Sequence, residues 1–188
     1  MSVIKDVNRC VYRFYPKNLS LYDEGYYKSQ EYLDRRAMVD EAFHQNAGWI
    51  SFKALIEEIM IDRSSPKADY SFGGGMTSYH LSIDPKAFGL DSERNMLVFT
   101  VLISVISDFW AFRFMEKTSD GWSARYTTKN ETEEALVRAV SGLVKKCFPE
   151  HEKLPEGIHQ LTVNDVYMRY AEESGATVFE LLFTDHDN

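Results

Sequence analysis

Two side chains in predicted strands carry chemistry that a functional site could use, the imidazole of His80 and the guanidinium of Arg113. His80 alternates with Tyr79, Leu81 and Ile83, so it points to the opposite face of its strand from these apolar residues. There it could act as a general base, provided that an orienting partner comes from elsewhere in the fold. The alternative is a surface histidine or a hydrogen-bonded structural one.

Arg113 lies in the middle of the alternating segment 109–117, on the same side as Phe109, Ala111 and Met115. If that side is buried, the guanidinium needs a carboxylate partner, which the protein or a ligand could provide. If that side faces water, no partner is needed. His80 and Arg113 together therefore define one hypothesis, an enzyme of unknown class.

Three large side chains flank the glycine run 73–75, namely Tyr70, Phe72 and Met76. Exposed aromatic side chains often anchor a protein partner, because they bring contact area at a small loss of conformational entropy. We predict these three as binding residues, and the alternative is that they fold back onto the core. The glycine run fits neither GxxxxGK[ST] nor GxGxxG between a strand and a helix, so it predicts a turn rather than a phosphate site.

Other motifs for catalysis or metal binding are absent from the sequence. No serine lies in a GxSxG pattern, and no pair of His or Cys residues has ligand spacing. The segment 185–187 has the composition of a metal cluster, but it lies at a chain end without rigid support. Cys10 and Cys147 lie in apolar patterns, which predicts two buried thiols in a reducing compartment. The sequence therefore predicts neither a metal nor a cofactor.

The chain has 188 residues and a formal net charge of −8, from 21 basic and 29 acidic residues. This balance, with no run of Lys and Arg, argues against nucleic-acid binding, which needs a basic face. No apolar stretch reaches the roughly 20 residues of a membrane span, and the N-terminus lacks a secretory signal. These features predict one soluble, cytoplasmic domain over residues 1–188. The acidity favours solubility, and it would also suit a basic protein partner.

The spacing of apolar residues predicts the helices and strands along the chain, since strands alternate every second residue and helices repeat every three to four. At 96–106 the β-branched residues favour a strand over a helix. Asp120-Gly121 predicts a tight hairpin turn, and Thr162 with Asp165 predicts a helix start. The predicted strands are 7–15, 79–83, 96–106, 109–117, 122–128 and 177–183, and the predicted helices are 26–46, 51–62, 131–147 and 162–174.

Strands joined by tight turns predict an α+β fold, with an antiparallel sheet of about five to six strands and helices packed on one face. For function we favour a non-enzymatic intracellular protein-binding module, such as an acidic inhibitor or immunity-type protein that recognises a basic partner by complementary charge. The comparison with inhibitors is an analogy based on composition. The alternatives are the enzyme around His80 and Arg113 and a structural subunit of a homo-oligomer. A concave pocket with a histidine or carboxylate would favour the enzyme, and a large apolar patch the subunit.

Overall fold

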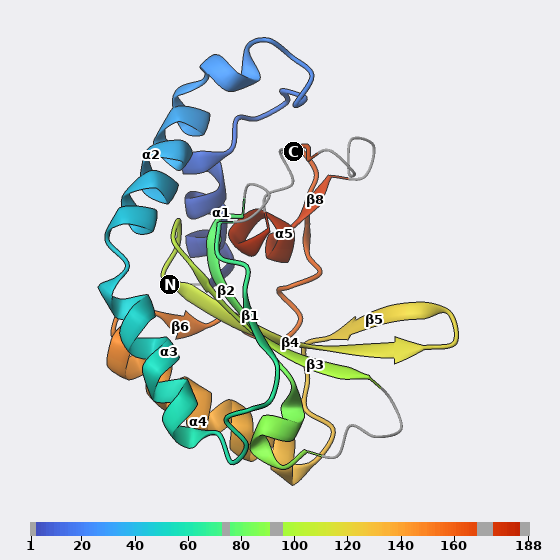
Figure 1. The fold of residues 1–188 in the computed structure, drawn as a ribbon. Helices are drawn as coiled ribbons and strands as arrows, with labels where there is room; N and C mark the ends of the chain where they lie inside the picture. Colours follow the sequence, from blue (N-terminus) through green and yellow to red (C-terminus); the bar gives the residue numbers. More distant parts are fainter. Residues whose placement is uncertain (1–2, 73–75, 91–95, 169–174, 185–188) are drawn as a thin grey trace.

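A computed structural model describes residues 3–72, 76–90, 96–168 and 175–184. Within these ranges the chain has an α+β fold, as the sequence predicts (Figure 1). The helices are α1 (Val3–Phe14), α2 (Gln30–His44), α3 (Ala47–Ile59), α4 (Glu131–Cys147) and α5 (Val178–Phe183), with 3-10 turns at Tyr26–Lys28 and Pro85–Phe88. The strands are β1 (Lys67–Asp69), β2 (Ser78–Ile83), β3 (Leu97–Ser104), β4 (Phe109–Thr118), β5 (Gly121–Arg125), β6 (Glu152–Lys153), β7 (Thr162–Val163) and β8 (Ala176–Thr177).

The main sheet contains β1 to β5 in chain order, and each of these strands pairs antiparallel with the next. The short strand β6 adds to the beginning of β4 in parallel, and β7 and β8 form a separate antiparallel pair. The register places Ser82 of β2 opposite Thr100 of β3, and Thr100 opposite Arg113 of β4. Because directly opposite residues point to the same face, these three polar side chains form a row across the sheet.

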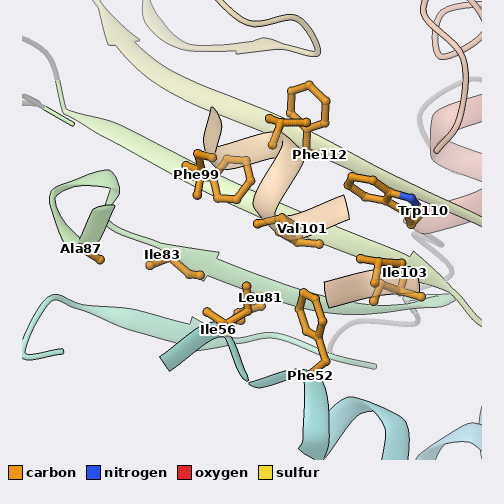
Figure 2. Close-up of a cluster of buried hydrophobic side chains, with 14 of the residues drawn as sticks. Phe52, Ile56, Leu81, Ile83, Ala87, Phe99, Val101, Ile103, Trp110 and Phe112 are labelled. Carbon is orange, nitrogen blue, oxygen red and sulfur yellow. The ribbon is translucent and has the colours of Figure 1, made fainter. Parts of the chain in front are cut away.

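Helices α3 and α4 cover the face opposite to this polar row. Phe52 and Ile56 of α3 pack there with Val101 of β3 and with Trp110 and Phe112 of β4, and all five are buried (Figure 2). The apolar residues of α3 repeat at helical spacing and those of the strands alternate, so each element turns one apolar side to this core.

Helices α1 and α5 pack against part of the other face, at the end where β3 finishes (Figure 1). Val7 and Val11 of α1 share a buried cluster with Phe183 of α5, and Leu102 of β3 and Ala111 of β4 contribute to the same cluster. This second cluster fixes α1 against the sheet, so the polar side of α1 lies near the β3–β4 connection.

The prediction of a strand at 7–15 is wrong, because this segment belongs to α1. Cys10, Tyr12 and Phe14 do alternate, but the residues that become buried are Val7, Val11 and Phe14. Their spacing of four and three is the helical repeat, and it begins before the alternating run.

The prediction of a strand at 177–183 is also wrong, because residues 178–183 form α5. Thr177 and Glu180 make a capping box, in which the Thr177 hydroxyl accepts from the Glu180 N–H and the Glu180 carboxylate accepts from the Thr177 N–H. Every apolar residue of α5 is buried, so no polar stripe shows the helical period. The predicted helix at 162–174 is wrong at its start, where Thr162–Val163 is β7, and residues 169–174 lie outside the described ranges.

The remaining element predictions are confirmed, with small shifts of their bounds. The ambiguous segment 96–106 contains β3, the turn at Asp120-Gly121 joins β4 to β5, and the helix 131–147 is α4. The predicted helix 26–46 divides into a 3-10 turn and α2, because the Ser29 side chain accepts a hydrogen bond from the Tyr32 N–H and caps a new helix.

No helix in the described ranges combines the length and the apolar character that a membrane span requires.

Candidate functional site

His80 is almost fully buried on β2, and two of the predicted binding residues surround it. Its Nδ1 lies 3.2 Å from the Met76 sulfur, and its ring centroid lies 5.4 Å from that of Tyr70. Tyr70 itself is 53% exposed, so it covers His80 on one side and meets solvent on the other. Residues that the sequence suggested for two separate hypotheses, catalysis and partner binding, therefore lie together.

Two hydroxyl groups extend this cluster along the polar row of the sheet. The His80 Nε2 lies 3.2 Å from the Ser82 Oγ, which lies 3.1 Å from the Thr100 Oγ1. A methionine sulfur can only accept a hydrogen bond, so we place the imidazole hydrogen on Nδ1 and the free lone pair on Nε2. In this arrangement Ser82 donates to His80, and Thr100 donates to Ser82.

The pKa of His80 is lowered to about 4. Burial is the largest cause, and the positive charge of Arg113 adds to it. The negative charge of Asp69 opposes the shift but has a smaller effect than Arg113. The imidazole is therefore neutral at neutral pH. A neutral imidazole is able to accept a proton, but the neighbouring guanidinium makes the protonated form unfavourable.

Arg113 lies on the same face of the sheet and is partly buried. Its guanidinium carbon is 5.7 Å from the centre of the Phe179 ring, and burial lowers its pKa. Among the described residues no carboxylate pairs with Arg113, and its Nε is buried without a hydrogen-bond partner. The structure thus brings Arg113 close enough to influence His80 electrostatically, without a hydrogen bond between the two side chains.

An open groove of about 490 Å³ lies beside Ser82, between β1 and the beginning of β3. Its lining includes Ser82 and Val98 together with three side chains that are more than half exposed, Tyr70, Met96 and Trp122. Aromatic and apolar walls around a single hydroxyl are typical of a small-ligand site. Ser82, Met96 and Trp122 carry no local signal in the sequence, because they come together only through sheet pairing.

Phe72, the third predicted binding residue, lies apart from Tyr70 and Met76. Its ring packs at 5.1 Å from Tyr79 and at 6.0 Å from Phe43, measured between centroids. Tyr79 and His80 point to opposite faces of β2, so Phe72 belongs to the side of the sheet that α3 covers. The three predicted residues therefore do not form one continuous surface.

A larger cavity, of about 800 Å³, lies at the other end of β3. It is enclosed by α1, the C-terminal half of α2, the β3–β4 connection and the segment after α4. Its ionised lining residues are five carboxylates and two guanidinium groups, so its formal charge is negative. These residues are Asp6, Glu41, Asp108, Glu150 and Glu152, with Arg9 and Arg13. We call it the acidic cavity.

Only part of this negative charge is neutralised locally. Asp6 pairs with Arg9 at 3.0 Å. Glu41 accepts a hydrogen bond from the Gln45 side chain at 3.2 Å, but this neutral amide does not compensate its charge. Within the described part of the chain, Asp108, Glu150 and Glu152 form no ion pair, and all three are exposed. The acidic cavity therefore presents three free carboxylates at its margin.

The wall of the acidic cavity combines aromatic rings with polar atoms. Phe109 and Phe148 line it, and His151 donates from Nε2 to the Ser104 carbonyl oxygen at 2.9 Å. In the described ranges the His151 Nδ1 and the Ser107 Oγ are buried without a hydrogen-bond partner. Buried polar atoms without a hydrogen-bond partner are uncommon in folded proteins. These two atoms in the cavity wall therefore have unused hydrogen-bonding capacity.

The acidic cavity does not follow from the sequence as long as residues 7–15 are predicted to be a strand. As a helix, α1 brings Asp6, Arg9, Cys10 and Arg13 to one side, since residues three to four apart are neighbours on a helix. The signal that could have revealed this side was the spacing of these polar residues, which follows the same repeat as the apolar side.

Both cysteines are free thiols. The Cys10 Sγ donates to the Ile106 carbonyl oxygen at 2.9 Å, and burial, helped by the charge of Asp108, raises its pKa to about 12. The thiolate is the reactive form, so Cys10 is chemically inert at neutral pH although it lines the acidic cavity.

The described residues contain no group of three or more His, Cys, Asp or Glu side chains placed to hold a metal ion. The segment 185–187 lies outside the described ranges. No known protein family, curated protein or solved structure matches this chain.

Proposed function

We propose that the protein is a cytoplasmic protein-binding module that holds a basic protein partner at the acidic cavity, a role that needs no catalytic step. The observation that supports this best is the set of three free carboxylates, Asp108, Glu150 and Glu152, at the margin of one concave site. Complementary charge steers a basic partner to such a site and rejects acidic competitors. An acidic inhibitor that neutralises a basic protein is the class of protein that this arrangement suits.

The chemistry of the cavity favours a lysine or arginine side chain as the part of the partner that enters. Such a side chain has an apolar stem and a cationic head. Phe109 and Phe148 offer aromatic surface for the stem or for a stacked guanidinium, and the three carboxylates accept hydrogen bonds from the head. The charge-assisted bonds would set the orientation of the partner, and the aromatic contacts would contribute buried area.

The test is to isolate a basic partner with the tagged full chain and then to measure direct binding by calorimetry at low and at high salt. We expect Asp108→Asn, Glu150→Gln and Glu152→Gln together to weaken binding at least tenfold, since each removes a charge without removing volume. Binding of the wild-type chain should also weaken as salt rises, because exposed charges are screened.

The matched control carries three neutralised carboxylates elsewhere on the surface, Asp40→Asn, Glu58→Gln and Glu134→Gln, which are exposed and do not line the cavity. This control has the same net charge as the cavity variant, so it separates a local effect from the overall charge of the chain. Equal binding by the two variants would contradict the proposed site, and salt-independent binding would contradict recognition by charge.

A further inference from the structure

We propose that Ser82 is a nucleophile toward activated acyl groups bound in the groove beside it, with His80 as the base that takes its proton. Ser82 lines the groove, whereas His80 lies next to it on the same face of β2, outside the groove lining, and is 4% exposed. A nucleophile at the wall of a pocket, with a base within hydrogen-bond distance on the protein side, is the arrangement that covalent catalysis requires.

The hydrogen bonds around Ser82 hold its hydroxyl in the orientation that this step needs. The Ser82 Oγ is 3.2 Å from the His80 Nε2 and 3.1 Å from the Thr100 Oγ1. The Met76 sulfur at Nδ1 keeps the imidazole hydrogen on that nitrogen, so the lone pair of Nε2 faces Ser82. Thr100 is almost fully buried, and its hydroxyl can donate to Ser82 and leave the other lone pair of the oxygen free for attack.

The reaction class is acyl transfer from an ester with a good leaving group. The Ser82 oxygen forms a bond to the acyl carbon while the bond from that carbon to the leaving oxygen breaks. The Ser82 proton passes to Nε2 and then to the leaving oxygen. A water molecule attacks the acyl carbon in the same way, which releases the acid and restores Ser82.

The surroundings of His80 decide which substrates can react. The charged group on its own face is Arg113 from β4, and the uncharged Tyr70 and Met76 contact it. Asp69 from β1 acts on it only through its charge, because the Asp69 carboxylate lies on the other face of the sheet, where it accepts from Trp49 and Lys53. The Nδ1 contacts sulfur rather than a carboxylate, and burial with the Arg113 charge lowers the pKa of His80 to about 4. Because so weak a base gives little assistance, only acyl groups with a good leaving group should react.

The walls of the groove indicate an apolar or aromatic acyl group. Tyr70, Met96 and Trp122 line the groove with large exposed side chains, and Val98 adds apolar surface to it. This activity is independent of partner binding at the acidic cavity, because the groove and the cavity lie at opposite ends of β3. Either proposal can therefore fail without the other.

The probe for this activity is an alkyl fluorophosphonate with an attached fluorophore, which marks activated serines covalently. We expect one label on each full-length chain, placed on Ser82 by mass spectrometry of its peptide. Ser82→Ala should lose the label, and Ser123→Ala, which changes an exposed serine on β5, should keep it. His80→Gln should label about 100-fold more slowly, because glutamine fills a similar space without acting as a base.

A second measurement on the wild-type chain avoids any doubt about folding of the variants. The labelling rate should be constant from pH 8 to about pH 5 and should fall only as His80 takes up a proton near pH 4. Circular dichroism at each pH separates this fall from acid unfolding, and a structural serine would show no such profile while the chain stays folded. The proposal is overturned if Ser82 stays unlabelled, if His80→Gln labels as fast as the wild type while folded, or if the rate already falls near pH 6.5.

Discussion

At the scale of single residues, Glu133 carries a negative charge into the interior at the beginning of α4. Its side chain is 4% exposed, and its carboxylate oxygens accept from both terminal nitrogens of Arg125 at 2.5 and 2.8 Å. The Lys129 backbone N–H donates to the same carboxylate at 2.7 Å, so the charge is fully hydrogen-bonded. Such a pair tolerates burial only while both partners are present.

We therefore expect Glu133→Gln to lower the free energy of unfolding by about 3 kcal/mol, since it breaks a buried ion pair. This is the lower end of the range for such a loss, because Glu116 still pairs with Arg125 at 2.6 Å. The measurement is unfolding in urea, with the midpoint and slope compared to those of the wild type. Glu134→Gln is the matched control, because Glu134 is the next residue of the same helical turn and is exposed. A similar loss in both variants would assign the effect to the helix dipole rather than to the buried pair.

At the scale of elements, the turn into β8 depends on a glycine that cannot carry a side chain. Gly175 has a φ of +72°, and a Cβ placed on it would lie 2.7 Å from the Val163 carbonyl oxygen and 2.8 Å from the Asn164 Cα. Both neighbours are backbone atoms of β7 or of the residue after it, so neither can rotate away. The close approach of the β7 and β8 segments thus requires glycine at this position.

Gly175→Ala should destabilise the protein by more than about 1 kcal/mol, through backbone strain and the clash with β7. Gly142→Ala, in the middle of α4, should have the opposite effect and stabilise by up to about 1 kcal/mol, since a Cβ there meets nothing within 4 Å. Chemical denaturation of the two variants measures both signs in one experiment. A stable Gly175→Ala chain would mean that β7 and β8 separate without loss to the rest of the fold.

The elements that sequence reasoning predicted well are those whose local signals agree with one another. In α4 the cap at Asn130, the acidic first turn, the apolar stripe and the basic last turn all indicate the same helix. In α5 the six residues are apolar throughout, so burial on every side removed the periodic signal and left only the Thr177 capping box. In α1 the helical repeat was present, but a shorter alternating run overlapped it.

The candidate sites were less predictable than the elements, because each depends on tertiary contacts. His80 and Arg113 were correctly expected to share a sheet, yet their effect on each other depends on the β2–β3–β4 register. Ser82 carries no local motif, and its contact with His80 follows from two residues being on one face of one strand. The α1 residues that line the acidic cavity share one side only in a helix, so they could not be recognised as a group while this segment was predicted to be a strand.

At the scale of the whole molecule, two buried histidines make the folded chain sensitive to acid. Burial, and then the charge of Arg113, lowers the pKa of His80 to about 4, and burial also lowers the pKa of His159. In the unfolded chain both imidazoles return to a pKa of about 6.5, so unfolding takes up protons between that value and pH 4. The stabilisation is complete above about pH 6.5 and is lost as the pH falls toward 4.

We expect the free energy of unfolding to decrease from pH 7 to pH 5 in the wild type, and to decrease less steeply in His80→Gln. One proton fewer taken up changes the slope by at most about 1.4 kcal/mol per pH unit. His44→Gln, which alters an exposed histidine, should keep the wild-type slope. Urea titrations at several pH values measure the slopes, and the same slope in His80→Gln and the wild type would show that His80 titrates normally.

The packing of α1 against α5 also has a consequence for how the chain is made. The Tyr15 hydroxyl donates to the Leu181 carbonyl oxygen at 2.6 Å, across a separation of 166 residues. During synthesis α1 leaves the ribosome long before α5 has been made. The apolar residues Val7, Val11 and Phe14 therefore stay exposed until α5 can pack against them. The α3–α4 side of the sheet can assemble first, and the nascent chain then closes its second core with the last helix.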